Sequence, residues 1–115
     1  MSRLNPEYVK MTCEKASESG YFTLLSMKLV DFEIGASTLE IEIAPKHLQP
    51  FGVVHGGVFA SIIDAAAFWA AFPELEPDQK MTTVDLKLNY LAPAISGKLV
   101  VKGKRIKVGR TLGLA

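Results

Sequence analysis

PFGVVHGGVFASIIDAAAFWAAF, residues 50–72, is a long apolar run that contains a single acid, Asp64. From Gly57 to Ala71 nearly every residue is apolar and many are alanine, a composition that favours a helix buried along most of its circumference. The run is too short and too rich in small residues for a membrane span, which needs about 20 consecutive apolar residues. We therefore expect a helix in the interior of the fold.

Asp64 and the glycines before this helix are the first functional candidates. An unpaired carboxylate in apolar surroundings costs several kcal/mol, so a chain that keeps Asp64 there is expected to use it. Gly56 and Gly57 stand where the first helix amides have no partner inside the helix and the helix dipole is positive. A ligand oxygen that gains negative charge could therefore bind the Gly56 or Gly57 amide.

Length, charge and cysteine content limit the class of protein. With 115 residues, of which 49% are hydrophobic, residues 1–115 are expected to form one domain. The formal net charge of +1 gives no general attraction to nucleic acid or membrane. Cys13 is the only cysteine, which excludes an intrachain disulfide, and residues 1–10 lack the apolar core of a signal peptide. We therefore expect a cytoplasmic protein.

The hydrophobic pattern on both sides of the central helix predicts a sheet. Before the helix we expect a short amphipathic helix from Pro6 to about Gly20 and a hairpin of two strands, 21–34 and 38–43, the first with a bulge. After the helix, which Pro73 and Pro77 end, strands are expected over 81–91 and 98–108, and residues 111–115 begin another. This order predicts an α+β domain in which an antiparallel sheet wraps the central helix.

Four features together resemble the hotdog-fold acyl-CoA thioesterases, and most closely the phenylacetate-pathway type and its 4-hydroxybenzoyl-CoA relatives. They are Gln49 six residues before His55, the His55-Gly56-Gly57 motif, Asp64 nine residues after His55, and LNYLAP (88–93) at the end of a predicted strand. The resemblance implies a hotdog fold, no metal or other cofactor, and a homodimer or homotetramer. It also implies a further strand after residue 115, so we expect the C-terminal strand of this chain to be truncated.

The resemblance assigns a role to each residue that matches the family's motifs. Asp64 corresponds to the nucleophile or general base, and the Gly56 amide to the donor that polarises the thioester carbonyl. Gln49 corresponds to a side chain that holds water or substrate, Thr83 to an assisting hydroxyl, and His55 to a residue that shapes the turn. Active sites of the family form across a dimer interface, with the loop and helix start from one subunit and the acid from the other. We also expect Gly57 and Asn89 to bind the substrate.

Six basic residues and no acid lie between Lys98 and Arg110. One interpretation is a solvated strand face. The other, which the resemblance favours, is that Lys107, Gly109 and Arg110 hold the phosphates of coenzyme A. Nucleic-acid binding is disfavoured because no aromatic residue lies among these charges. A metal site is not expected, since His47, His55 and Cys13 are too few for a zinc site.

The function predicted from the sequence is hydrolysis of an acyl- or aryl-CoA thioester. Asp64 attacks the carbonyl or activates water, and the Gly56 amide stabilises the oxyanion. Two alternatives remain open: a non-catalytic acyl-CoA-binding or regulatory protein that uses the same pocket, and, less favoured, a hotdog dehydratase, whose family motif pairs an acid with a catalytic histidine. The pattern does not name the acyl group.

Overall fold

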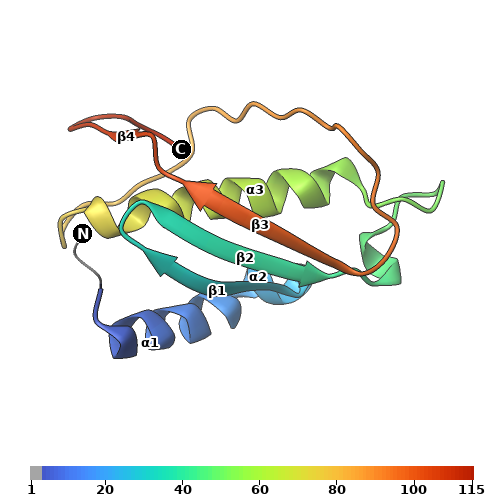
Figure 1. Cartoon of the computed structure of the whole chain (residues 1–115), viewed down its shortest axis with the longest axis horizontal. Coiled ribbons are helices and arrows are strands. Elements are labelled where there is room, and N and C mark those ends of the chain that lie inside the picture. The colour runs from blue at the N-terminus through green and yellow to red at the C-terminus, as the bar shows by residue number, and fades with distance from the viewer. Residues whose placement is uncertain (1–3) are drawn as a thin grey trace.

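The computed structural model describes residues 4–115, and its central feature is one long helix that lies along an antiparallel sheet (Figure 1). Helices and strands follow one another as the predicted α+β class requires, which confirms that prediction. The elements in chain order are α1 (Pro6–Ser17), α2 (Gly20–Leu25), β1 (Met27–Glu33), β2 (Ala36–Glu42), η1 (Pro45–His47), α3 (Gly56–Ala71), η2 (Phe72–Glu74), β3 (Lys98–Lys104), β4 (Lys107–Val108) and β5 (Gly113–Leu114).

The larger sheet has the strand order β1-β2-β3, and both pairs are antiparallel. The chain turns between β1 and β2 at Gly35, whose φ is 84°. A glycine suits this position because the left-handed conformation strains any residue with a Cβ. Alternate residues of the central strand β2 point into the core, where Leu39 and Ile41 are fully buried. The register of β1 shifts between Leu29 and Asp31, which confirms the predicted bulge.

The buried face of α3 is a narrow stripe rather than most of its circumference, so that prediction is wrong. Val58, Ile62, Ala66 and Ala70 are buried at four-residue spacing, and the other α3 residues, apart from Ala71, are partly or fully exposed. The reason is that the β1–β3 sheet covers only one side of the helix. The flank that carries Asp64 is left accessible for a site.

The close approach of α3 to the sheet depends on Gly103 in β3. A Cβ built on Gly103 would lie 2.2 Å from the Ala66 carbonyl oxygen and 2.3 Å from Ser37 Oγ, so only glycine fits there. Ser37, which faces Gly103 across the β2–β3 ladder, donates a buried hydrogen bond of 2.6 Å to the same carbonyl. This contact fixes both the height of α3 above the sheet and its rotation about its own axis.

α3 continues into η2, and the combined stretch Gly56–Glu74 is long and apolar enough to cross a membrane by length and composition alone, with a mean hydropathy of 1.4. The prediction that the run is too short for a span is therefore wrong on length. Its contacts are nevertheless those of a core helix, because its buried stripe packs on the sheet and Ala66 accepts a hydrogen bond from Ser37.

The first predicted strand, residues 21–34, is a helix over its first part. Residues 20–25 form α2, and Ser26 ends it in the left-handed conformation at a φ of 53° before β1 begins at Met27. The residues have high β propensity, but Phe22 and Leu25 pack against the hydrophobic core, and Phe22 also lines the cavity beside α3. Tertiary packing thus overrides local propensity here.

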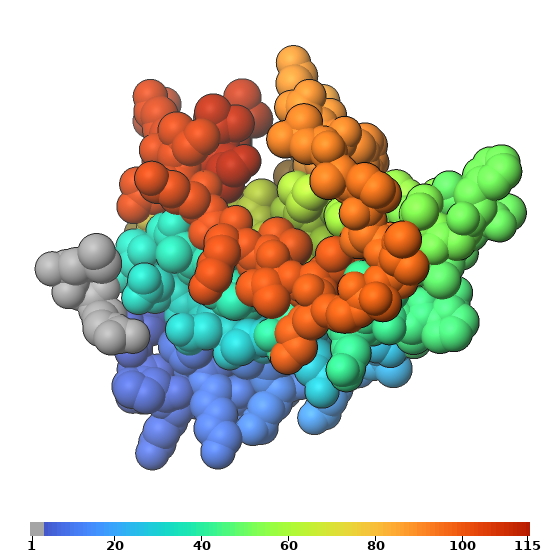
Figure 2. Space-filling model, turned by 45° about the vertical axis from the view of Figure 1, so that its right-hand side comes forward, coloured from blue at the N-terminus to red at the C-terminus, as the bar shows by residue number. Residues whose placement is uncertain are grey.

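The predicted strand over 81–91 does not form. Residues 80–91 make no backbone–backbone hydrogen bond within residues 4–115, and the apolar side chains of Val84 and Tyr90 are 78% and 58% exposed. The segment is extended and follows α3 back toward its N-terminus (Figure 1), but it has no neighbouring strand to pair with. Figure 2 shows α3 at the bottom of a gap between this segment, in orange, and the β4–β5 hairpin, in red.

The predicted strand 98–108 is divided in two. β3 ends at Lys104, and after Arg105 and Ile106 the chain enters β4, which pairs with β5 in a separate two-stranded sheet. Arg105 turns toward the end of α3, where its Nε lies 2.7 Å from a carboxylate oxygen of Glu74. The remaining strand predictions, 38–43 and the start of a strand in 111–115, are confirmed by β2 and β5.

We expect Gly103→Ala to lower the free energy of unfolding by about 1–3 kcal/mol, the usual cost of overpacking a close contact, because backbone atoms of Ala66 cannot move aside alone. Chemical denaturation measures the change. Gly20→Ala is the control, since a Cβ there meets nothing within 4 Å and the residue begins a helix. Equal stability of the two variants would show that α3 is not held by this contact.

Candidate active site

The N-terminus of α3 is capped by a histidine side chain. His55 Nδ1 accepts a hydrogen bond of 2.8 Å from the Gly57 amide, and the His55 carbonyl accepts one from the Val58 amide. Because Nδ1 accepts, a neutral His55 ring carries its proton on Nε2. A Cβ on Gly57 would lie 3.1 Å from Nδ1, so the glycine allows the ring to fold over the helix end. The geometry suits the turn-shaping role expected for His55.

The Gly56 amide, in contrast, has no hydrogen-bond partner among residues 4–115. Of the two amides predicted to receive an oxyanion, Gly57 is occupied by His55 and Gly56 is available. Tyr90 contacts the next peptide, Gly56–Gly57, since its hydroxyl donates to the Gly56 carbonyl at 3.1 Å, and its ring packs edge-on against Phe59. A free amide therefore lies at the positive end of the helix, next to a peptide that His55 and Tyr90 hold in place.

Asp64 lies on the accessible flank of α3, where a hydroxyl orients its carboxylate. Thr83 Oγ1 donates to Asp64 Oδ1 at 2.6 Å, so the structure brings together two of the predicted residues that are 19 positions apart. Asp64 is only partly buried, and the burial cost inferred from the sequence is accordingly reduced. The hydrogen bond from Thr83 fixes the carboxylate and leaves Oδ2 free to act.

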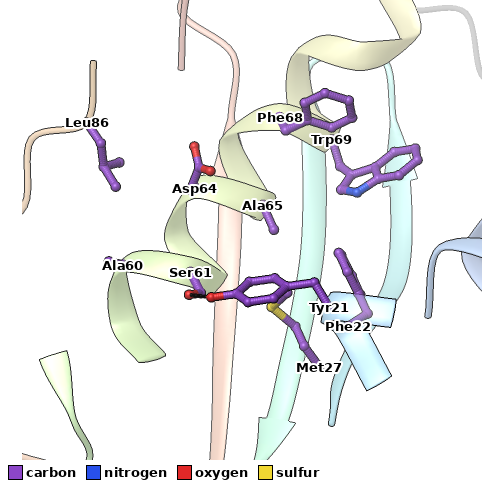
Figure 3. Close-up of a pocket in the computed structure, with 10 residues that line it drawn as sticks. All are labelled: Tyr21, Phe22, Met27, Ala60, Ser61, Asp64, Ala65, Phe68, Trp69 and Leu86. Atoms are coloured by element: carbon purple, nitrogen blue, oxygen red, sulfur yellow. Dashed lines mark hydrogen bonds between the residues drawn. The ribbon is translucent and has the colours of Figure 1, made fainter. Parts of the chain in front are cut away.

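Asp64 stands at the edge of an apolar cavity of about 490 Å³ between α3 and α2 (Figure 3). Ser61, Asp64, Ala65 and Phe68 line it from one face of α3, because residues three, four and seven apart share a helix face. An apolar cavity beside an oriented carboxylate is suited to the hydrocarbon part of a substrate. The remaining lining residues are Tyr21, Phe22, Met27, Ala60, Trp69 and Leu86.

Asp64 and the Gly56 amide cannot act on one substrate atom within a single chain. They are eight residues apart on one continuous helix, which places them about 12 Å apart along its axis. A reacting carbonyl needs both groups within hydrogen-bond or van der Waals reach. The candidate residues thus form two separate groups on the chain: an amide half, with Gly56 and His55, and an acid half, with Asp64, Thr83 and the cavity.

Gln49 lies seven residues before Gly56 in the sequence, and Asn89 is next to Tyr90, which contacts the Gly56 carbonyl, but neither side chain is held against the Gly56 amide. The Gln49 side-chain carbonyl accepts a hydrogen bond from the Phe51 amide, which folds it onto its own loop and leaves its NH₂ group to donate. Asn89 is exposed beside Tyr90 on the extended segment. Their predicted roles in holding water or substrate stay predictions.

Lys107, Gly109 and Arg110 lie together on the β4–β5 hairpin and are all exposed. The Gly109 amide donates to the Leu112 carbonyl at 2.8 Å, which closes the turn. None of the three lines the cavity beside Asp64. Elsewhere in the basic segment Lys98 pairs with Glu40 at 3.4 Å, as Arg105 does with Glu74, so part of its charge is neutralised within the fold.

The other histidine and the cysteine serve the fold. His47 is buried, with Nδ1 accepting from the Ala44 amide and Nε2 donating to the Leu25 carbonyl at 2.6 Å. Burial, aided by the nearby Asp31 and Glu14 carboxylates, raises the pKa of the Cys13 thiol to about 11, which disfavours the nucleophilic thiolate. Within the described part of the chain, no three His, Cys, Asp or Glu side chains are grouped so that they could hold a metal ion.

Comparison with known proteins identifies the family. The model of the thioesterase superfamily matches residues 51–114, which include α3, the segment that follows it and the β3–β5 strands. The chain belongs to the thioesterase superfamily. This confirms the family predicted from the sequence, and the long helix on an antiparallel sheet is its hotdog fold.

Relatives of this thioesterase-superfamily chain occur in bacteria and in animals. A 1,4-dihydroxy-2-naphthoyl-CoA hydrolase of Listeria monocytogenes is 29% identical over 87 residues, covering 76% of this chain and 71% of that protein. Mouse acyl-coenzyme A thioesterase 13 is 29% identical over 77 residues, covering 66% of this chain and 54% of the mouse protein. The crystal structure of zebrafish thioesterase superfamily member 2 superposes with a TM-score of 0.78 at 25% identity, covering 96% of this chain and 81% of that one.

Three residues at the site of this superfamily member were not singled out from its sequence. Ser61 could have been, because it lies three residues before Asp64 and therefore on the same helix face. Tyr90 lies within the LNYLAP motif, but its bond to the Gly56 carbonyl joins residues 34 apart. Tyr21 had no signal, since it was assigned to a strand and its contact with Ser61 spans 40 residues.

We expect His55→Ala to lower the free energy of unfolding by about 1 kcal/mol, because it removes the N-cap acceptor of α3. His55→Asn keeps a short side-chain acceptor and should remain close to the unmodified chain. Chemical denaturation and thioester turnover are measured on both variants. If His55→Asn is as stable as the unmodified chain but as inactive as His55→Ala, the imidazole takes part in the chemistry.

Proposed function

We propose that this chain hydrolyses acyl-CoA thioesters, with the amide half of one subunit and the acid half of another forming each active site. The observation that carries the proposal is Asp64, oriented by Thr83 beside an apolar cavity, in a chain that belongs to the thioesterase superfamily. The names of the Listeria and mouse relatives, a naphthoyl-CoA hydrolase and an acyl-coenzyme A thioesterase, support a CoA thioester as substrate.

In this proposal the acyl group lies in the cavity with its carbonyl between the two halves. Asp64 takes a proton from water while the water oxygen attacks the carbonyl carbon, and the Gly56 amide donates to the oxyanion of the tetrahedral intermediate. When the intermediate collapses, the C–S bond breaks, and the proton held by Asp64 passes to the departing CoA sulfur. Direct attack by Asp64, followed by hydrolysis of the resulting anhydride, uses the same residues.

Two subunits are needed because Gly56 and Asp64 are separated by about 12 Å along the axis of α3. A second argument for association is the segment 80–91, which is extended along α3, lacks a backbone partner in residues 4–115 and exposes Val84 and Tyr90. We therefore propose a homodimer, alone or within a homotetramer, that joins the acid half of each chain to the amide half of its partner.

The remaining assignments belong to the same proposal. The exposed Lys107 and Arg110 and the Gly109 turn would bind CoA phosphates, with Gln49 and Asn89 contacting substrate near the amide half. The chemistry uses no cofactor beyond these residues. The expected compartment is the cytoplasm, where a single thiol such as Cys13 stays reduced.

We expect Asp64→Asn to lower kcat for an acyl-CoA by at least about 10²-fold while leaving the fold and substrate binding intact, because the amide keeps the hydrogen bond to Thr83 but cannot take a proton. Release of free CoA thiol measures turnover. Asp85→Asn is the matched control, an exposed acid on the same segment as Thr83. Binding without turnover in the unmodified chain would instead identify a non-catalytic acyl-CoA-binding protein.

Mixing two inactive variants tests the shared site. Gly56→Pro removes the free amide yet suits the first helical position, and His55, at a φ of −61° and a ψ of 138°, has a conformation that a following proline allows. Equal amounts of Gly56→Pro and Asp64→Asn should recover about one quarter of the unmodified activity, since half of the dimers are mixed and each has one intact site.

Gly56→Ala is the control for that experiment, because it adds a Cβ beside Tyr90 but keeps the N–H, and it should retain most of the activity. The subunits must be shown to exchange, for example by mass spectrometry of labelled chains. No recovery between exchanging subunits would refute the shared site, as would turnover by a monomer.

A further inference from the structure

The cavity of the acid half is bounded along the helix axis by two different kinds of wall (Figure 3). Toward the C-terminus of α3 it ends at Phe68 and Trp69, whose rings meet edge-on at 5.3 Å. These rings also contact Phe72 and, through Trp69, the buried Phe32. This wall is part of a continuous aromatic cluster, so it is fixed by the core.

The opposite wall is the ring of a single residue, Tyr21 of α2. It is 57% exposed, lines the cavity, and reaches Ser61 of α3 through a hydrogen bond of 2.6 Å between the two side-chain oxygens. Ser61 and Phe68 are seven residues apart, so the two walls are separated by about 10 Å along the helix. Among the lining residues at this end, which include Ala60 and Ser61 of α3, Tyr21 has the largest side chain.

The direction of the Tyr21–Ser61 hydrogen bond follows from the partners of Ser61. The Ser61 hydroxyl has one hydrogen, and it donates that hydrogen to the Gly57 carbonyl at 2.8 Å. Tyr21 is therefore the donor and Ser61 Oγ the acceptor. The tyrosine hydroxyl is thus a latch that ties α2 to the first turns of α3.

α2 is also held at its other end. The buried His47 donates to the Leu25 carbonyl at 2.6 Å, and Ser26 ends the helix in the left-handed conformation. A helix of six residues is too short to be stable alone, so these contacts determine where Tyr21 lies. The Tyr21 ring is consequently positioned by the fold and yet belongs to one replaceable side chain.

We propose that Tyr21 is a specificity-determining residue: its ring, latched to Ser61, closes the cavity and limits the length of the acyl group that can lie beside Asp64. The inference rests on the proposed function and adds to it the residue that sets acyl length. Replacing the ring opens the cavity toward solvent along α3, whereas removing only the hydroxyl releases the latch and keeps the ring.

The first experiment measures kcat/KM for straight-chain acyl-CoAs from butanoyl to hexadecanoyl. Tyr21→Ala should raise the ratio of dodecanoyl-CoA to hexanoyl-CoA turnover by at least about tenfold, the effect expected when a pocket ceases to exclude extra methylenes, and Tyr21→Phe should raise it less. Leu24→Ala is the control, since Leu24 is on α2, is 66% exposed and does not line the cavity. An unchanged ratio in Tyr21→Ala overturns the proposal.

The second experiment needs neither turnover nor CoA. Trp69 is the only tryptophan of the chain and lines the cavity, so its fluorescence reports occupancy. Straight-chain 1-alkanols of increasing length are titrated against the unmodified chain and Tyr21→Ala, and the variant should bind longer alkanols than the unmodified chain does. If the longest alkanol that binds is the same for both proteins, Tyr21 does not limit the length of the cavity and the proposal is wrong. If the alkanol limits shift but no thioester is hydrolysed, the wall stands and the proposed function fails.

Discussion

The contact of α3 with the sheet at Gly103 is the constraint on which the orientation of Asp64 depends. Because the Ala66 carbonyl meets β3 where no Cβ is present and accepts a hydrogen bond from Ser37, the helix can neither rise nor rotate. The stripe through Ile62 is then committed to the core, and the flank through Asp64 must face away from it. The core contact of Gly103 and Ser37 with Ala66 thereby orients α3 so that Asp64 lies beside the cavity.

The same rigidity is the reason why we propose that two chains share each active site. A continuous helix keeps the Gly56 amide and the Asp64 carboxylate about 12 Å apart whatever the side chains do. Each group is nevertheless prepared: His55 occupies the Gly57 amide and leaves Gly56 free, while Thr83 orients the carboxylate. Preorganised but separated groups are useful only if a second copy supplies the missing half, which is the physical reason to propose association.

The sequence predicted those features that depend on local pattern. Strict alternation placed β2, the apolar run placed α3, and the helix-start motif placed an available amide at Gly56 or Gly57, of which Gly56 is free in the structure. Features that depend on a distant partner were beyond it. Residues 81–91 have strand propensity, yet a strand is a property of two segments, and within residues 4–115 this one has no backbone partner. Likewise the helical state of Tyr21 is decided by Ser61 and by His47 at the far end of α2.

In the proposed enzyme, selection of the acyl group and stabilisation of the oxyanion depend on residues at different places along α3. Tyr21, Phe68 and Trp69 surround the acyl cavity on the same chain that carries Asp64, while the Gly56 amide and its Tyr90 contact lie at the far end of α3. In a dimer that joins unlike halves, the chain that supplies the acid also selects the acyl group. The chain that supplies the amide would stabilise the oxyanion. The acyl preference of each active site would therefore be determined by the chain that supplies its Asp64 and not by the chain that supplies its Gly56 amide.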